Sequence, residues 1–184
     1  MEFKNTPLSG VLIIQPDIFG DERGYFYETY HKVKFVEHGI TEEFIQDNQS
    51  FSEKGIVRGL HFQKPPTSQS KLVRVISGEV YDVAVDLRPT SPTFGNWFGI
   101  YLSGENKTML YVPVGFAHGF CVTSETAIFC YKCGELYSKD DESGIRFDDP
   151  DLNIDWPVKP EDVKLSDKDA VLKTFAEIKG ELAW

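Results

Sequence analysis

The chain has 184 residues, of which 41% are hydrophobic and 26% are charged, a composition that excludes a disordered or collagen-like protein. The formal net charge of −10 makes the protein a poor partner for nucleic acid polymers and for anionic membranes. The acidity is uneven, because residues 1–134 carry 15 acidic and 12 basic side chains, whereas residues 135–184 carry 14 and 7. An anionic small ligand therefore remains compatible with the first part of the chain, provided that basic side chains gather in one pocket.

The sequence shows no signal of membrane insertion or secretion. No run of 18 apolar residues is present, and residues 1–5 are not followed by the apolar core of a signal peptide. Three cysteines without a secretory signal indicate reduced thiols, so we expect a cytoplasmic protein. Cys130-x-x-Cys133 lies in an apolar run and has no second pair, so we interpret it, like Cys121, as buried core thiols rather than as a redox or zinc pair.

Short apolar runs separated by Gly, Pro, Ser and Asn follow one another along the chain, a pattern typical of all-β proteins. The turn residues Ser77-Gly78 predict that the strands on either side of them form a hairpin. In the strand after this turn, the two-residue period places Val80, Asp82, Ala84 and Asp86 on one face. In chain order, we expect strands at residues 11–14, 24–30, 44–46, 56–58, 72–76, 80–87, 97–102, 109–112, 119–122 and 127–132.

Helical signals are few. Apolar spacing and a stop at Gly39 predict a short helix at residues 31–38. Near the C-terminus, Ser166 stands three residues before Asp169, which resembles a capping box that opens a second helix. The apolar face of that helix is predicted by four residues at four- and three-residue steps, namely Val171, Phe175, Ile178 and Leu182.

The predicted fold class is therefore all-β. We expect a single domain over residues 1–184, built as a jelly-roll barrel or sandwich, because strands recur about every ten residues. The helices at residues 31–38 and at the C-terminus are short appendages to this domain.

Histidines and basic side chains that could carry chemistry fall in two segments. One segment holds Arg58, His61 and Lys71, and the other ends in Pro113-x-Gly115-x-x-His118, which is half of the pattern of metal-binding cupin barrels. The other half of that pattern contains two histidines and a glutamate as metal ligands. Here Gln63 stands at the position of the second histidine, and Lys71 stands at the position of the glutamate. A charged ammonium repels a divalent cation, so we expect no metal site. Two imidazoles, an ammonium and a guanidinium instead suit an anionic intermediate.

Several of these residues also allow a structural interpretation. His118 alone is equally compatible with a core histidine and with a functional one. Asp82, on the inward face of its strand, is either a structural hydrogen-bonding group or a functional carboxylate. Composition alone favours core packing for Tyr131, which lies in the apolar strand at residues 127–132.

The chain resembles the dTDP-4-dehydrorhamnose 3,5-epimerase family, which has the cupin fold, over residues 17–169. Any one of the matching blocks is weak evidence, but their order and spacing together are specific. The blocks are Asp21-x-Arg23-Gly24-x-Phe26-x-Glu28, Gln46-Asp47-Asn48-x-Ser50, Gly55-Ile56-Val57-Arg58-Gly59-Leu60-His61-Phe62-Gln63, Lys71-Leu72-Val73-Arg74-Val75, Asp82-Val83-Ala84-Val85-Asp86-Leu87-Arg88, Ser91-Pro92-Thr93-x-Gly95-x-Trp97, Pro113-x-Gly115-Phe116-Ala117-His118-Gly119-Phe120 and Leu165-Ser166-x-Lys168-Asp169.

The resemblance implies a metal-free and cofactor-free proton transfer on dTDP-4-dehydro-6-deoxy-D-glucose. Hydrogens on carbons 3 and 5 of this sugar are acidic, because the ketone at carbon 4 can carry the charge as an enolate. By resemblance, His61 is the base and Asp169 is its carboxylate partner. Lys71 stabilises the enolate, and Tyr131 returns a proton on the opposite face of the sugar. For Asp169, the capping role at a helix start remains an alternative.

The resemblance also implies the residues that bind the substrate. Arg23 and Arg58 match positions that bind the diphosphate, and His118 contacts the sugar. Phe19 and Tyr137 are candidates to enclose the thymine base. The remaining implied substrate-binding residues are Glu28, Gln46, Asn48, Glu142 and Lys168. In the family, some of these contacts come from the neighbouring subunit, so we expect a homodimer with shared sites.

Three alternatives stay open beside the double epimerase. One is a related enzyme that epimerises only carbon 3 or only carbon 5, or a ketoisomerase of such a sugar. A second is a non-catalytic cupin that binds sugar nucleotides, and a third is a metal-dependent cupin oxygenase. The presence of His61, Lys71, Tyr131 and Asp169 together counts against the second of these.

Overall fold

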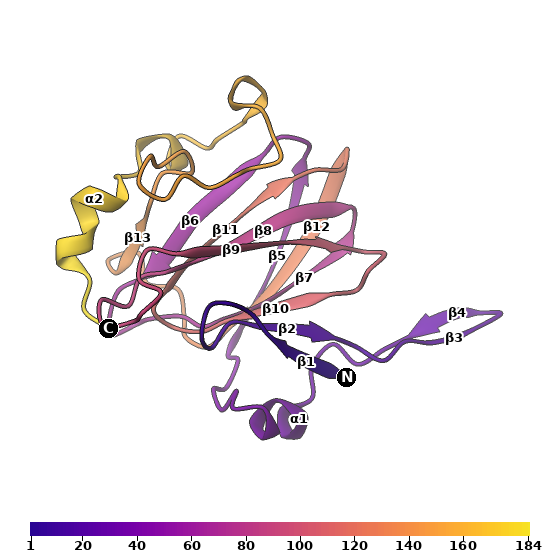
Figure 1. Ribbon diagram of the computed structural model, residues 1–184. Coiled ribbons are helices and arrows are strands. Elements are labelled where there is room, and N and C mark those ends of the chain that lie inside the picture. The colour runs from indigo at the N-terminus through magenta and orange to yellow at the C-terminus, as the bar shows by residue number, and fades with distance from the viewer.

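The computed structural model describes residues 1–184, and most of its regular structure consists of strands in two facing antiparallel sheets (Figure 1). The all-β prediction is therefore confirmed, and the two sheets form a sandwich rather than a closed barrel. The larger sheet consists, in spatial order, of β1 (Glu2–Asn5), β2 (Leu12–Gln15), β10 (Met109–Val112), β7 (Lys71–Ser77), β12 (Thr126–Cys133) and β5 (Gln46–Glu53). The smaller sheet consists of β13 (Glu142–Gly144), β6 (Val57–Gln63), β11 (Phe116–Val122), β8 (Glu79–Asp86) and β9 (Trp97–Ser103).

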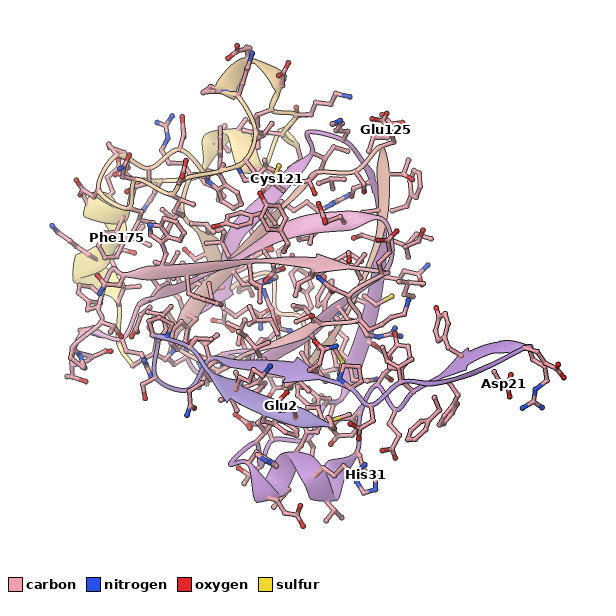
Figure 2. The ribbon with its side chains drawn as sticks, turned by 45° about the vertical axis from the view of Figure 1, so that its right-hand side comes forward. Glu2, Asp21, His31, Cys121, Glu125 and Phe175 are labelled. Atoms are coloured by element: carbon pink, nitrogen blue, oxygen red, sulfur yellow. The ribbon has the colours of Figure 1, made fainter.

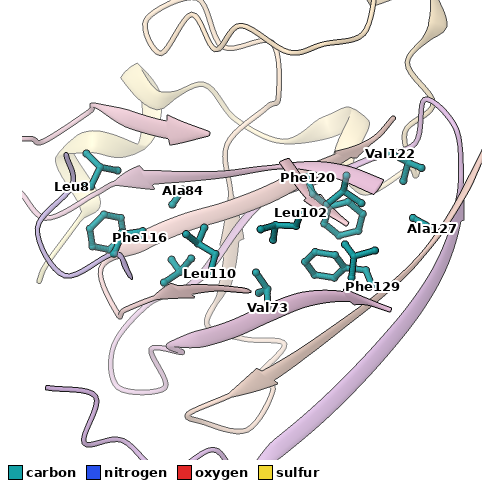
Figure 3. Packing of buried hydrophobic residues seen from close by; sticks show 14 residues of the cluster. Leu8, Val73, Ala84, Leu102, Leu110, Phe116, Phe120, Val122, Ala127 and Phe129 are labelled. Carbon is teal, nitrogen blue, oxygen red and sulfur yellow. The ribbon is translucent and has the colours of Figure 1, made fainter. Parts of the chain in front are cut away.

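The main core fills the space between the two sheets (Figure 3). Phe120 of β11 and Phe129 of β12 stack there with 4.1 Å between their ring centroids. Val80 and Ala84 belong to this core, which confirms the inward face predicted for the strand at residues 80–87. Burying one side chain of this size contributes about 2 kcal/mol to folding, so the core holds the two sheets together.

Both sheets also carry structure on their outer faces. Helix α1 (Lys32–Glu37) buries Phe35 against Leu72 and Met109 on the outer side of the larger sheet, close to the predicted residues 31–38. The outer side of the smaller sheet packs against the C-terminal segment, where Phe175 and Ile178 lie in one cluster with strand residues. None of the helices is both long and apolar enough to cross a membrane.

The predicted hairpin around Ser77-Gly78 is wrong. Strand β7 pairs with β10 and β12 in the larger sheet, whereas β8 pairs with β9 and β11 in the smaller one. The turn therefore takes the chain from one sheet to the other. Gly78 has φ +78°, and a Cβ atom at this position would lie 2.0 Å from the carbonyl oxygen of Thr126, so only glycine fits. The turn residues correctly indicated a reversal but carried no information about the partner strand.

The C-terminal helix is present in pieces rather than as one apolar face. The pieces are η1 (Pro160–Asp162), η2 (Asp169–Val171), α2 (Phe175–Ile178) and η3 (Lys179–Glu181). Val171 is 79% exposed, and the capping box is made by Thr174 and Glu177. The predicted continuous helix is wrong because the chain is extended at Leu172 and Lys173 forms a bridge with Ile145. These extended residues separate the turn at Asp169 from helix α2.

A two-stranded arm projects from the body of the molecule (Figures 1 and 2). It consists of β3 (Phe19–Asp21) and β4 (Gly24–Phe26), which pair only with each other. The strand predicted at residues 24–30 is therefore shorter than expected. The arm exposes Phe19, Tyr25 and Phe26, each by 60% or more, although aromatic side chains of this size are normally buried.

The three cysteines are free thiols, and they differ in burial. Cys121 and Cys133 are buried, as predicted. Cys130 is half-buried and its thiol donates to Oε1 of Gln49 at 3.4 Å, so the prediction of a buried thiol is wrong there. Residues three apart on a strand point to opposite faces, so Cys130 and Cys133 do not face each other as a pair.

A buried carboxylate at the end of β8 gives a testable prediction of stability. Burial alone would raise the pKa of Asp86, but hydrogen bonds from Arg88, Ser91 and Thr93 outweigh it and lower the pKa from 3.8 to about 2. A group with a lowered folded-state pKa stabilises the fold above its unfolded pKa, and this contribution is lost as the pH falls through the folded value. We expect Asp86 to contribute about 2 kcal/mol at neutral pH, a contribution that is lost as the pH falls from 3.8 to about 2.

The measurement is urea unfolding of the wild-type protein and of Asp86→Asn at neutral and at acidic pH. The difference between their free energies of unfolding should shrink as the solution is acidified. Asp140→Asn, at an exposed position, serves as the control and should match the wild type throughout. A difference for Asp86→Asn that stays constant with pH would contradict this account.

Candidate active site

A cavity of about 240 Å³ opens between the two sheets. Strands β7 and β12 supply one wall and strands β6 and β11 supply the other. Seven of the predicted site residues line this cavity, and so do Ser50, Phe120 and Phe129. The seven are Arg58, His61, Lys71, His118, Tyr131, Glu142 and Lys168. The fold thus gathers positions from distant parts of the chain around one space.

His61 and Asp169 form a carboxylate–imidazole pair at this cavity. The Nε2 atom of His61 lies 2.5 Å from Oδ1 of Asp169, although the two residues are 108 positions apart in the sequence. Burial alone would raise the pKa of Asp169, but the contacts with His61 and Ser166 outweigh it and hold the pKa below its ordinary value. The carboxylate is therefore ionised at neutral pH. With Nε2 directed at Asp169, Nδ1 is the ring nitrogen left to exchange a proton with a ligand.

Asp169 also contacts Ser166, its partner in the predicted capping box, although η2 begins after Lys168 without a side-chain cap. Ser166 donates its hydroxyl to Oδ2 of Asp169 at 3.0 Å and accepts the backbone N–H of Asp169 at 3.1 Å. The two carboxylate oxygens therefore have different partners, one in His61 and one in Ser166. The two contacts are compatible, because Ser166 binds Oδ2 of the carboxylate and leaves Oδ1 directed at the imidazole of His61.

Lys71 faces the same cavity from the opposite sheet. Burial lowers the pKa of its ammonium group, and the charges of Cys133 and Asp82 oppose that shift. Lys71 lies directly across from Cys133 in the pairing of β7 with β12. A lysine in this setting can stabilise negative charge that develops on a ligand, because little water competes for it.

Tyr131 lies on the wall opposite His61. It belongs to β12 of the larger sheet, whereas His61 belongs to β6 of the smaller sheet. Burial raises the pKa of Tyr131, so its hydroxyl stays protonated at neutral pH and can donate a proton. A planar ligand between the two sheets would thus meet an imidazole on one side and a phenol on the other. This placement in the cavity wall differs from the core packing that composition alone suggested.

A second carboxylate–imidazole pair lies beside the first. The Nε2 atom of His118 lies 2.9 and 3.0 Å from the two carboxylate oxygens of Asp82, which is fully buried. His118 on β11 is the direct partner of His61 on β6, so the two imidazoles stand side by side. Sequence reasoning placed Asp82 on the inward face but did not assign it a partner. The signal that could have found the pair is the register of β8 with β11, which a single sequence does not reveal.

The residues predicted to contact the nucleotide fall into two groups. Gln46, Asn48 and Tyr137 lie near the cavity mouth, where Tyr137 donates its backbone N–H to Oε1 of Gln46 at 2.9 Å, and Gln46 donates to Asn48 at 3.1 Å. Arg58 points into the cavity, and its Nε atom donates to the hydroxyl of Ser52 at 3.1 Å. This arrangement leaves the remaining guanidinium nitrogens of Arg58 available for an anion.

The other group lies outside the cavity of the same chain. Phe19 and Arg23 belong to the projecting arm, where Arg23 pairs with Asp21 at the arm's tip (Figure 2). Glu28 follows the arm and accepts from Lys34 at 2.5 Å. Neither arm residue lines the cavity that holds His61. A single chain therefore does not bring all the predicted substrate-binding residues together.

The positions that hold metal ligands in other cupins have different uses here. The side chain of Gln63 donates to the carbonyl oxygens of Thr67 and Leu136 and accepts the backbone N–H of Ser138 at 2.8 Å, so it fixes the surrounding loops. Lys71 occupies the position of the carboxylate. No three His, Cys, Asp or Glu side chains lie together in a group that could hold a metal ion.

Comparisons with known proteins identify the family to which the chain is similar. Residues 5–177 match the family model described as dTDP-4-dehydrorhamnose 3,5-epimerase. The enzyme of that name from Shigella flexneri is 53% identical over 96% of this chain and 97% of its own length. The crystal structure of dTDP-6-deoxy-D-glucose-3,5-epimerase from Legionella pneumophila in complex with dTDP-4-keto-L-rhamnose superposes with a TM-score of 0.94 at 51% identity, covering 98% of this chain and 95% of that one.

A related enzyme with a narrower activity is more distant. The dTDP-4-dehydrorhamnose 3-epimerase of Streptomyces niveus is 38% identical over 99% of this chain and 88% of its own length. Both the family model and the relatives that share about half of the residues thus carry the name of the double epimerase. The chain belongs to the dTDP-4-dehydrorhamnose 3,5-epimerase family.

Proposed function

We propose that this protein is a dTDP-4-dehydrorhamnose 3,5-epimerase, acting as one domain over residues 1–184. It converts dTDP-4-dehydro-6-deoxy-D-glucose to dTDP-4-dehydro-L-rhamnose in dTDP-L-rhamnose synthesis. The observation that carries this proposal is the arrangement of one cavity, with the His61–Asp169 pair on one wall and Lys71 and Tyr131 on the other. The full-length similarity to enzymes of this name supports it.

In the proposed mechanism, His61 removes the proton from carbon 3 or carbon 5 through Nδ1. Asp169 holds the imidazole in position and stabilises it once it is protonated. The electron pair moves into the C–O bond of the ketone, and the ammonium of Lys71 stabilises the resulting enolate oxygen. Tyr131 then donates a proton to the same carbon from the opposite face, which inverts it. Before the second carbon reacts, His61 releases its proton to solvent and Tyr131 regains one from solvent. The reaction exchanges protons only, so it needs neither a redox cofactor nor a metal.

The competing activity within the family is epimerisation at carbon 3 alone. Incubation with dTDP-4-dehydro-6-deoxy-D-glucose in deuterium oxide, followed by NMR of the product, separates the two. We expect deuterium at carbons 3 and 5 and the L-rhamno product. Label at one carbon alone would refute the double epimerase, and no label at either would refute enzymatic activity on this substrate.

A chelator addresses the metal-dependent alternative. Prolonged dialysis against a chelator should leave turnover unchanged, because Lys71 stands where a metal ligand would be needed. Loss of activity on dialysis, with recovery when a divalent metal is returned, would contradict the proposed mechanism. The three free cysteines are in keeping with a reducing compartment, and we propose the cytoplasm as the place of this reaction.

We further propose that the enzyme works as a homodimer whose arms complete the partner's sites. The arm exposes large apolar side chains, and the outer face of the larger sheet exposes Phe51 and Ile76 where α1 does not cover it. Exposed apolar side chains grouped in this way indicate a protein interface. The arm carries Phe19 and Arg23, which do not line the cavity of their own chain, so a neighbouring subunit could receive them.

Mixed dimers test this arrangement. Arg23→Ala removes the basic side chain of the arm, and His61→Asn removes the base in the cavity. Each variant alone should be inactive. The two variants are mixed and reassociated in equal amounts. If the arm serves the partner, each mixed dimer regains one intact site, and about a quarter of wild-type activity should return. No recovery, in a sample that is dimeric by light scattering, would show that each arm serves its own subunit.

A further inference from the structure

Strand β5 carries a row of polar side chains on the face that it turns toward the space between the sheets, and one of them has no partner. The residues on this less exposed face are 46, 48, 50 and 52. Gln46 donates to Asn48 at 3.1 Å. Ser52 accepts the Nε–H of Arg58 at 3.1 Å. The hydroxyl oxygen of Ser50, by contrast, is buried and has no hydrogen-bond partner within the chain.

A buried hydroxyl without a partner is uncommon, because it has lost its contact with water and gained no hydrogen bond in return. Ser50 lines the cavity, and it is the only lining residue that has such an atom. One rotatable bond with three staggered positions sets the direction of a serine hydroxyl. A rotation about this bond is therefore enough to turn the oxygen toward a ligand. The structure thus indicates that a ligand, rather than the protein, completes the hydrogen bonding of Ser50.

The register of the larger sheet places Ser50 well away from the group that receives the ketone. Ser50 pairs with Phe129 on β12, whereas Lys71 pairs with Cys133 on the same strand. At a rise of about 3.3 Å per residue, the two positions are about 13 Å apart along the sheet. In the proposed mechanism, Lys71 binds the oxygen on carbon 4. Carbon 1, which carries the diphosphate, is on the opposite side of the sugar ring, so the diphosphate projects away from Lys71, and Ser50 lies on that side.

A cation accompanies Ser50 at this end of the cavity. Arg58 lines the cavity and binds Ser52, which is the next residue on the same face of β5. Neighbours on one face of a strand are about 7 Å apart, so an anion bound to the guanidinium lies within reach of the hydroxyl of Ser50. A hydroxyl that donates to a phosphate oxygen forms a charge-assisted hydrogen bond, which is stronger than one between neutral groups.

We infer that Ser50 is a further substrate-binding residue, whose hydroxyl donates a hydrogen bond to a diphosphate oxygen beside Arg58. This inference rests on the proposed function, because it takes the ligand to be a sugar nucleotide. It gives a role to the last residue of the block Gln46-Asp47-Asn48-x-Ser50. The diphosphate does not change during proton transfer, so the contact contributes to substrate binding and not to the rate of the chemical step.

Ser50→Ala tests the contact. The affinity for dTDP, measured by calorimetry, should fall about tenfold, as loss of a hydrogen bond to a charged group would cause. The KM for dTDP-4-dehydro-6-deoxy-D-glucose should rise by a similar factor, whereas kcat should stay within about twofold of the wild-type value. The free energy of unfolding without ligand should not fall, because the hydroxyl that is removed has no partner within the chain.

Ser103→Ala is the matched control. Ser103 is a buried serine on β9, outside the cavity, and its hydroxyl accepts the backbone N–H of Asn106 at 3.0 Å. Loss of this bond should lower the free energy of unfolding and leave the affinity for dTDP unchanged. The two variants together separate an effect on the ligand from an effect on the fold.

Two results would overturn the inference. Wild-type affinity of Ser50→Ala for dTDP, together with a raised KM, would place the contact on the sugar instead of the diphosphate. Unchanged dTDP affinity and unchanged KM would show that the substrate does not use this hydroxyl. A wild-type protein that binds dTDP but does not convert dTDP-4-dehydro-6-deoxy-D-glucose would refute the proposed function, and calorimetry would still decide the role of Ser50. A wild-type protein that does not bind dTDP would refute both.

Discussion

Replacing His61 by asparagine should lower kcat by about a thousandfold and should stop deuterium incorporation at both carbons. At the cavity, the ring of His61 has one nitrogen on the carboxylate of Asp169 and the other free for a ligand. Asparagine has a similar reach, but its amide is not a base at neutral pH. Because the same imidazole serves carbons 3 and 5 in the proposed mechanism, both exchanges should be lost together. Kinetics followed by NMR in deuterium oxide give both rates.

The control for this variant is His38→Gln. His38 stacks on Phe3 with 3.9 Å between ring centroids and lies at the end of α1, outside the cavity. We expect this variant to exchange both positions at the wild-type rate. Exchange that persists at one carbon in His61→Asn would contradict the assignment of a single base. In that case the neighbouring His118–Asp82 pair would be the next candidate for the second carbon.

Much of the fold was predictable because burial leaves a regular pattern in strands. The alternation in residues 80–87 predicted an inward face that includes Val80, Asp82 and Ala84, and the structure confirms that face. The pattern could not predict which strands are neighbours, since hydrogen-bonding partners in a sheet are set by register and by the whole topology. The wrong hairpin at Ser77-Gly78 is a consequence, because a tight turn between strands of one sheet and a turn between two sheets share the same residues.

Two predictions of secondary structure, the C-terminal helix and the strand at residues 24–30, differ from the structure because of tertiary contacts. The apolar spacing of Phe175 and Ile178 correctly marked residues buried against the smaller sheet. The helix they predicted is interrupted because Lys173 bridges to Ile145, an interaction that no local pattern encodes. The arm is a similar case, because the β-forming aromatic residues at Tyr25 and Phe26 do produce a strand, but within one chain it pairs only with β3 and these side chains are mostly exposed.

The site was predictable in its chemistry but not in its geometry. Their closeness in the sequence singled out Arg58, His61 and Lys71 as a basic group for an anionic ligand, and all three line one cavity. The pairing of His61 with Asp169 across 108 residues came from the family resemblance, because sequence spacing contains no measure of such a distance. The connection of Tyr137 and Lys168 through Glu142 was not predicted at all, since it depends on loops from both sheets meeting at the mouth.

Replacing Tyr131 by phenylalanine should separate proton exchange from inversion. In the proposed mechanism His61 can remove a proton and return a deuteron to the same face without help from the opposite wall. Inversion requires a donor on that wall, where Tyr131 stands with a pKa raised by burial. Phenylalanine keeps the ring and its packing against Phe129, whose centroid lies 6.0 Å away, and removes only the acidic proton.

We therefore expect Tyr131→Phe to lower the rate of epimerisation by about a thousandfold, whereas deuterium continues to enter the unreacted substrate with retention of configuration. NMR of recovered substrate and product measures the two rates in one sample. Tyr101→Phe, on the other sheet and outside the cavity, is the matched control and should epimerise normally. If exchange and inversion fell by the same factor, Tyr131 would be acting on the enolate rather than as the donor. If inversion continued at the wild-type rate, water or another side chain would be the acid, and the opposite-wall arrangement of imidazole and phenol would not explain the change of configuration.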